Sequence, residues 1–123
     1  MPSKQEIFNR VWQYFVVEKN GRAGDPGMNG CYYRAANGNK CAVGILIPDN
    51  VYVPDLEIAV MELLSKFPHM SKFIGNDVDF LQVLQSCHDD ADEYAFNEDM
   101  EVNLRNLASN FSLSIPQQSP VGV

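Results

Sequence analysis

Long apolar stretches are missing from this chain. The longest, from Cys41 to Pro48, contains a glycine and ends at a proline, so it falls well short of the roughly 20 residues that a membrane-crossing helix needs. The N-terminus also lacks a basic start followed by an apolar segment. We therefore expect no membrane span, no secretory signal and a cytoplasmic location.

Positive charge is scarce. Nine Lys and Arg residues face sixteen Asp and Glu residues, which gives a net charge of −7 and argues against broad binding of a nucleic-acid backbone. The imbalance lies in the second half, where Arg105 is the one basic residue after position 72. Seven of the nine acidic residues after position 72 fall between 89 and 101, on either side of Tyr94, and four of them are candidate partner-binding residues: Asp92, Glu93, Glu98 and Asp99. Such a segment can repel nucleic acid, imitate it, bind a basic partner or serve solubility alone.

Cysteine is also rare, and its number is odd. Cys31, Cys41 and Cys87, in a chain without a secretory signal, predict reduced thiols rather than a disulfide framework. A redox pair of Cys31 and Cys41 across a turn stays open as an alternative. Together with His88 these cysteines are the right ligand types for zinc, but they lack the short spacing of a structural site. We expect no metal and no cofactor.

The remaining pattern predicts one globular domain over residues 1–113 and a frayed tail over 114–123. Ser3 and Glu6 form a capping box at the start of a first helix that should end near Gly21. Apolar spacing predicts three further helices, one from Pro54 to Phe67, one capped by Asn76 or Asp77, and one capped by Asn97. Between the first two helices, a glycine-rich loop leads into aromatic residues and an Asn37-Gly38 pair that is typical of a β-hairpin over 31–47. The predicted fold class is α+β, mostly helical with one small hairpin, and an all-helical fold is the alternative.

Four short blocks carry a resemblance: Cys31-Tyr32-Tyr33-Arg34, Lys40-Cys41-Ala42-Val43-Gly44, Ile47-Pro48-Asp49 and Gln85-Ser86-Cys87-His88-Asp89. Over roughly residues 4–110 the chain resembles a family of small, largely uncharacterised proteins of phages and bacteria, from which Ile45 departs. The resemblance implies origin and type of partner rather than chemistry. It suggests a non-enzymatic accessory protein of phage or mobile-element type that binds a host factor in the host cytoplasm, as an inhibitor of a host defence component.

An enzyme is the first alternative. Cys41 as nucleophile, His88 as base and Asp89 as orienting group are the residue types of a thiol hydrolase. However, the apolar neighbours of Cys41 predict a buried thiol, and His88 falls in register with the apolar face of its helix. The residue pattern therefore favours structural roles for both side chains and no catalytic residues.

A small-ligand binding protein is the second alternative. Arg34 and Lys40 flank the predicted turn, and turn amides with a planar guanidinium can hold an anion such as a nucleotide, with Tyr33 available for stacking. The chain contains neither GxxxxGKS nor GxGxxG. Such a site often lies at a subunit interface, so a homo-oligomer belongs to this hypothesis.

Overall fold

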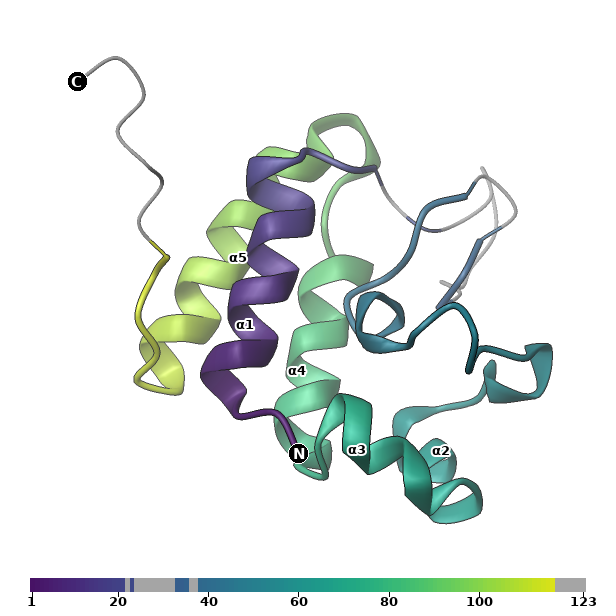
Figure 1. Ribbon diagram of the computed structural model, residues 1–123. Coiled ribbons are helices and arrows are strands. Elements are labelled where there is room, and N and C mark those ends of the chain that lie inside the picture. The colour runs from purple at the N-terminus through teal and green to yellow at the C-terminus, as the bar shows by residue number, and fades with distance from the viewer. Residues whose placement is uncertain (22, 24–32, 36–37, 117–123) are drawn as a thin grey trace.

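Helices form most of the chain in the computed structural model, which describes residues 1–21, 23, 33–35 and 38–116 (Figure 1). The longest are α1 (Lys4–Trp12), α4 (Val78–Asp89) and α5 (Phe96–Asn110), which lie side by side, with α5 running opposite to the other two. Two shorter helices, α2 (Val60–Lys66) and α3 (Ser71–Ile74), cover one end of this group. The remaining turns are a π-helical turn η1 (Gln13–Val17) and four 3-10 turns: η2 (Gly44–Leu46), η3 (Pro54–Leu56), η4 (Pro68–Met70) and η5 (Glu93–Ala95). None of the helices in the described ranges has the length and apolar character needed to cross a bilayer.

The predicted α+β class is wrong, because the described residues contain no β-strand. What remains of the hairpin is one antiparallel bridge between Arg34 and Lys40, closed by a turn in which Gly38 has a φ of 88°. Cys31, Tyr32, Ala36 and Asn37 lie outside the described residues. Among the described residues, the predicted arms 31–34 and 40–47 therefore do not form a sheet.

The hairpin does not form because side chains accept the hydrogen bonds of its backbone N–H groups. The amides of Tyr33 and Arg34 donate to the carboxylate of Glu57 at 2.8 and 3.0 Å, and the amide of Val43 donates to Oε1 of Gln85 at 3.1 Å. These donors would otherwise join the two arms of a hairpin. Because side chains take them, the second arm turns into the 3-10 helix η2 instead.

Polar side chains fix the start of α1 and the π-helical turn η1 that continues it. The capping box is confirmed, since Ser3 Oγ accepts from the Glu6 amide at 3.1 Å and Glu6 Oε1 accepts from the Ser3 amide at 3.0 Å. At the other end, the Asn97 side chain donates to the carbonyls of Phe15 and Asn20 at 3.0 and 2.9 Å. Asn97 was expected to cap α5, and that prediction is wrong. The carbonyl of Phe15 in the π-helical turn and that of Asn20 after it lie within reach of Asn97, so its amide ties η1 and the following residues to α5 instead.

The predicted helix from Pro54 to Phe67 is divided in two. A 3-10 turn, η3, is followed by an extended residue, Ala59, and only then by α2. Of the expected apolar face, Leu56, Val60 and Leu63 are buried, Leu64 and Phe67 are partly buried, and Ala59 is exposed. The interruption places Glu57 and Ile58 beside Tyr33, whose hydroxyl donates to the Ile58 carbonyl at 2.5 Å.

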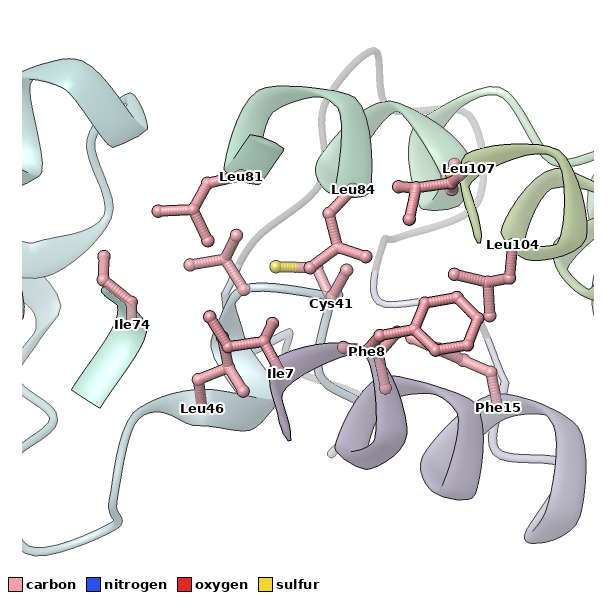
Figure 2. Close-up of a cluster of buried hydrophobic side chains, with 14 of the residues drawn as sticks. Ile7, Phe8, Phe15, Cys41, Leu46, Ile74, Leu81, Leu84, Leu104 and Leu107 are labelled. Carbon is pink, nitrogen blue, oxygen red and sulfur yellow. The ribbon is translucent and has the colours of Figure 1, made fainter. Parts of the chain in front are cut away.

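The core lies between α1, α4, α5 and the segment from Cys41 to Ile47 (Figure 2). Close approach of the backbone explains Gly44: a Cβ at this position would overlap the backbone of Tyr33. The Asp77 side chain caps α4 by accepting from the Phe80 amide at 3.0 Å, as predicted. Near the C-terminus, Ser114 exchanges two hydrogen bonds with the Gln5 side chain, and the rest of the predicted tail from residue 117 lies outside the described residues.

Candidate functional site

Cys41 lies in the middle of the core. Its exposed fraction is 0%, and Figure 2 shows its sulfur within the cluster of buried aliphatic side chains. The Sγ atom accepts from the Gly44 amide at 3.4 Å, which closes the turn before η2. Burial raises the pKa of the thiol to about 12, so the nucleophilic thiolate is disfavoured at neutral pH. The prediction that apolar neighbours bury this thiol is confirmed.

His88 is fully buried on the inner face of α4, between the rings of Phe15 and Phe96. Nε2 accepts from the Ala23 amide at 3.0 Å, and Nδ1 lies 3.1 Å from Oδ1 of Asp89. Because Nε2 accepts an N–H, the ring is neutral and its proton is on Nδ1, pointing to the carboxylate. Both ring nitrogens are therefore engaged.

The structure brings His88 and Asp89 of the hypothetical hydrolase into contact, but it does not couple His88 to Cys41. Asp89 contacts His88 as an orienting group would, but no ring nitrogen of His88 remains to take a proton from Cys41. A general base needs that nitrogen within hydrogen-bond reach of the nucleophile. The geometry supports structural roles, with His88 holding the chain at Ala23 against α4.

Arg34 and Lys40 lie close together, as the anion-site hypothesis requires. However, they surround a carboxylate of the chain itself, that of Asp49. The guanidinium of Arg34 lies 2.5 Å from Oδ1 of Asp49, and Nζ of Lys40 lies 3.6 Å from the same oxygen. Arg34 also donates to the Ile47 carbonyl at 2.6 Å and lies over the ring of Tyr52. The hydrogen bond from Arg34 and the charge of Lys40 lower the pKa of Asp49. An external anion would have to displace this carboxylate.

Tyr33, the third residue of that hypothesis, is 5% exposed and anchored by its hydroxyl to the Ile58 carbonyl. Burial raises the pKa of its phenol. Most of its ring is therefore unavailable for stacking on a ligand.

Glu57 is a central residue that no motif or spacing in the sequence indicated. Its two carboxylate oxygens accept three hydrogen bonds, from the amides of Tyr33 and Arg34 and from the Tyr52 hydroxyl at 2.7 Å. Burial and the bond to Glu57 raise the pKa of Tyr52 to about 12. A single glutamate in an irregular segment belongs to no periodic pattern, so the sequence contains no signal for its role.

The acidic segment forms the turn between α4 and α5 and the start of α5. Asp92 caps η5 by accepting from the Tyr94 amide at 2.9 Å, and Asp99 accepts from the Asp92 amide at 3.0 Å. Glu98 is exposed, and nothing is described of the Glu93 side chain. Two carboxylates thus hold the turn that presents Tyr94, whose side chain is 92% exposed.

Metal binding finds no support in the described part of the chain, where no group of three or more His, Cys, Asp or Glu side chains could hold an ion. Cys41 and Cys87 are free and buried there, and Cys31 lies outside the described residues. The redox-pair alternative therefore stays untested.

Comparison with known proteins adds no relative: no family model, curated protein or solved structure matches this chain.

Proposed function

We propose that the chain is a non-enzymatic accessory protein of phage or mobile-element type, which acts by binding a basic surface of a host protein such as a component of a host defence system. Its origin and type of partner rest on the four sequence blocks described above. The binding mode rests on the surface around Tyr94, which we call the Tyr94 surface: Asp92, Tyr94, Glu98 and Asp99.

The observation that carries the proposal is the 92% exposure of Tyr94 on a turn held by two carboxylates. Tyrosine is enriched among the residues that dominate the energy of protein interfaces, because its ring is large, rigid and amphipathic. A ring held on a short capped turn loses little conformational freedom on binding. Tyr94 therefore has the exposure and rigidity expected of a residue that anchors a protein interface.

Charge defines the partner. The acidic residues around Tyr94 repel one another in the free protein, and a basic surface relieves that repulsion on contact. Complementary charge also speeds the encounter and selects against acidic partners. The partner should therefore present Lys or Arg residues around an apolar recess that accepts the tyrosine ring.

The alternative functions are less well supported. A hydrolase needs a reactive thiol and a free imidazole nitrogen, whereas Cys41 is buried and His88 is engaged at both nitrogens. Sequestration of a small anion by Arg34 and Lys40 requires the loss of their contacts with Asp49.

The first experiment identifies the partner and maps it to this surface. The parent chain, a Tyr94→Ala variant and a Glu98→Lys variant are immobilised and incubated with bacterial host lysate, and the captured proteins are identified by mass spectrometry. Asp55→Lys is the matched control, since it makes the same charge change at an exposed residue of η3. We leave Asp92 and Asp99 unchanged because they hold η5, so their reversal would alter the fold as well as the charge.

The expected result is one basic protein that the parent and Asp55→Lys capture and the other two variants lose. Capture of the same proteins by all four chains would contradict the proposal. Circular dichroism checks that each variant is folded.

A further inference from the structure

Two cations and one carboxylate meet where the bridge between Arg34 and Lys40 approaches Asp49. Among the described residues, the ion pairs of both cations go to Oδ1 of Asp49, at 2.5 and 3.6 Å. The carboxylate of Glu57 is engaged by two backbone amides and the Tyr52 hydroxyl instead. Two positive charges therefore share one negative charge, and the cluster keeps one net positive charge.

Contacts other than these ion pairs hold both cations in place. Arg34 donates to the Ile47 carbonyl at 2.6 Å, and its guanidinium lies 4.8 Å from the centre of the Tyr52 ring. Lys40 pairs with Arg34 in the antiparallel bridge, and its amide donates to the Tyr14 hydroxyl at 3.0 Å. Because these contacts do not involve the carboxylate, both cations should keep their positions when it leaves. The site is therefore formed before a ligand arrives.

The carboxylate of Asp49 is held much less firmly. Its side chain is 81% exposed, whereas those of Arg34 and Lys40 are 20% and 30% exposed. The turn that carries Asp49 is closed by a backbone bond from the Val51 amide to the Pro48 carbonyl, without help from the Asp49 side chain. Rotation of this side chain thus releases the carboxylate into water, and ion pairs of such an exposed group are weak.

The charge balance decides which external anion can replace the carboxylate. A tethered carboxylate competes with a free anion at an effective concentration in the millimolar range, so a free monoanion gains nothing by taking its place. A dianion neutralises both cations. A phosphoryl group also presents three acceptor oxygens, which can bind the planar guanidinium and the ammonium at the same time.

We propose that Arg34 and Lys40 form a binding site for a phosphoryl dianion, and that Asp49 occupies this site in the free chain as an internal, displaceable ligand. The dianion is carried by free phosphate or by a phosphate monoester of a small molecule. Binding requires rotation of the Asp49 side chain and no change in the helices. The site goes beyond the proposed function and does not depend on it.

Ligands of different charge test the selectivity of the site. Inorganic phosphate is titrated into the full chain at about pH 7.5, where it is mostly the dianion, and amide NMR shifts are followed at constant ionic strength, with acetate as the monoanionic control. We expect phosphate to shift the amides of residues 34, 38–40 and 49–51, with a dissociation constant on the order of 1 mM. Acetate should leave them unchanged.

Adenosine monophosphate distinguishes the two sources of the phosphoryl group, with adenosine as its uncharged control. Tighter binding of adenosine monophosphate than of phosphate assigns the site to a phosphate monoester. Equal or tighter binding of phosphate assigns it to free phosphate. Binding of adenosine at the same residues would overturn the proposal, because recognition would then not depend on the phosphoryl group.

Variants separate displacement of the carboxylate from a general effect of charge. Asp49→Asn removes the internal ligand and should tighten phosphate binding by roughly fivefold. Asp55→Asn removes the same charge at an exposed residue of η3 and should change binding little. Lys40→Gln should weaken phosphate binding by roughly fivefold, whereas Lys66→Gln, at an exposed ion pair on α2, should not.

Three further results would overturn the site. These are equal shifts with phosphate and acetate, no shifts near the two cations even in the Asp49→Asn chain, and equal affinities of the parent and Asp49→Asn chains for phosphate. Circular dichroism checks that each variant is folded. All of these measurements leave the Tyr94 surface intact, and Tyr94→Ala tests that surface separately.

Discussion

Slow alkylation of Cys41 is the prediction that bears most directly on whether this chain is a thiol enzyme. Burial raises its pKa to about 12, so on the order of one thiol in 10⁴ is ionised at pH 8, against roughly one in four for an ordinary thiol with a pKa of about 8.5. The factor between them is about 10³, and the reagent also needs the core to open before it can reach a sulfur with no exposed surface. We therefore expect iodoacetamide to label Cys41 at least about 10³ times more slowly in the native protein than in denaturant.

The assay is time-resolved alkylation at pH 8, with and without urea, followed by peptide mapping to separate Cys41 from Cys31 and Cys87. Cys87 provides an internal comparison, because it is 6% exposed and burial raises its pKa to about 11. It should react faster than Cys41. Native labelling of Cys41 within tenfold of the denatured rate would refute the reasoning and restore the hydrolase hypothesis.

Three further predictions concern stability. Gly44→Ala should lower the free energy of unfolding, measured in urea, by about 3 kcal/mol, because the new methyl group meets the backbone of Tyr33, which cannot rotate away. A loss below about 0.5 kcal/mol would refute the close approach of the two backbones. Glu57→Gln should lower the free energy of unfolding by about 2 kcal/mol, since an amide cannot accept all three hydrogen bonds. The control Glu62→Gln, at an exposed ion pair on α2, should change it little. Equal effects of the two variants would mean that Glu57 does not hold residues 33 and 34. Asp77→Ala should cost about 1 kcal/mol at neutral pH through loss of the α4 cap. The bond from the Phe80 amide and the Lys4 contact lower the pKa of Asp77, so this difference should shrink as pH falls from about 5 to about 3; a difference independent of pH would contradict the charged cap.

Local signals in the sequence predicted the helix ends that depend on neighbouring residues. Ser3 with Glu6, and Asp77 before the apolar stripe of α4, act within one helical turn, and both caps are present in the structure. The burial of Cys41 and His88 followed from apolar register in the same way.

The failures all involve contacts between distant segments. The hairpin prediction treated 31–34 and 40–47 as if they could bond only to each other, whereas Glu57 and Gln85 take their amides from farther along the chain. Asn97 has the chemistry of a cap, but its amide bonds to the carbonyls of Phe15 in η1 and of Asn20 instead. Apolar periodicity carries no information about such bonds, so the interruption at Glu57 could not be predicted from it.

Action through the Tyr94 surface is tested by measuring, at low and high salt, the affinity of the captured partner for the parent chain and for the variants Tyr94→Ala, Glu98→Lys and Asp55→Lys. We expect Tyr94→Ala to raise the dissociation constant by roughly 30-fold at both salt concentrations. Glu98→Lys should slow association at low salt and have a smaller effect at high salt, and Asp55→Lys should bind nearly as the parent does. If Tyr94→Ala and Glu98→Lys bind like the parent at both salt concentrations, the Tyr94 surface serves solubility alone and the proposed function is wrong.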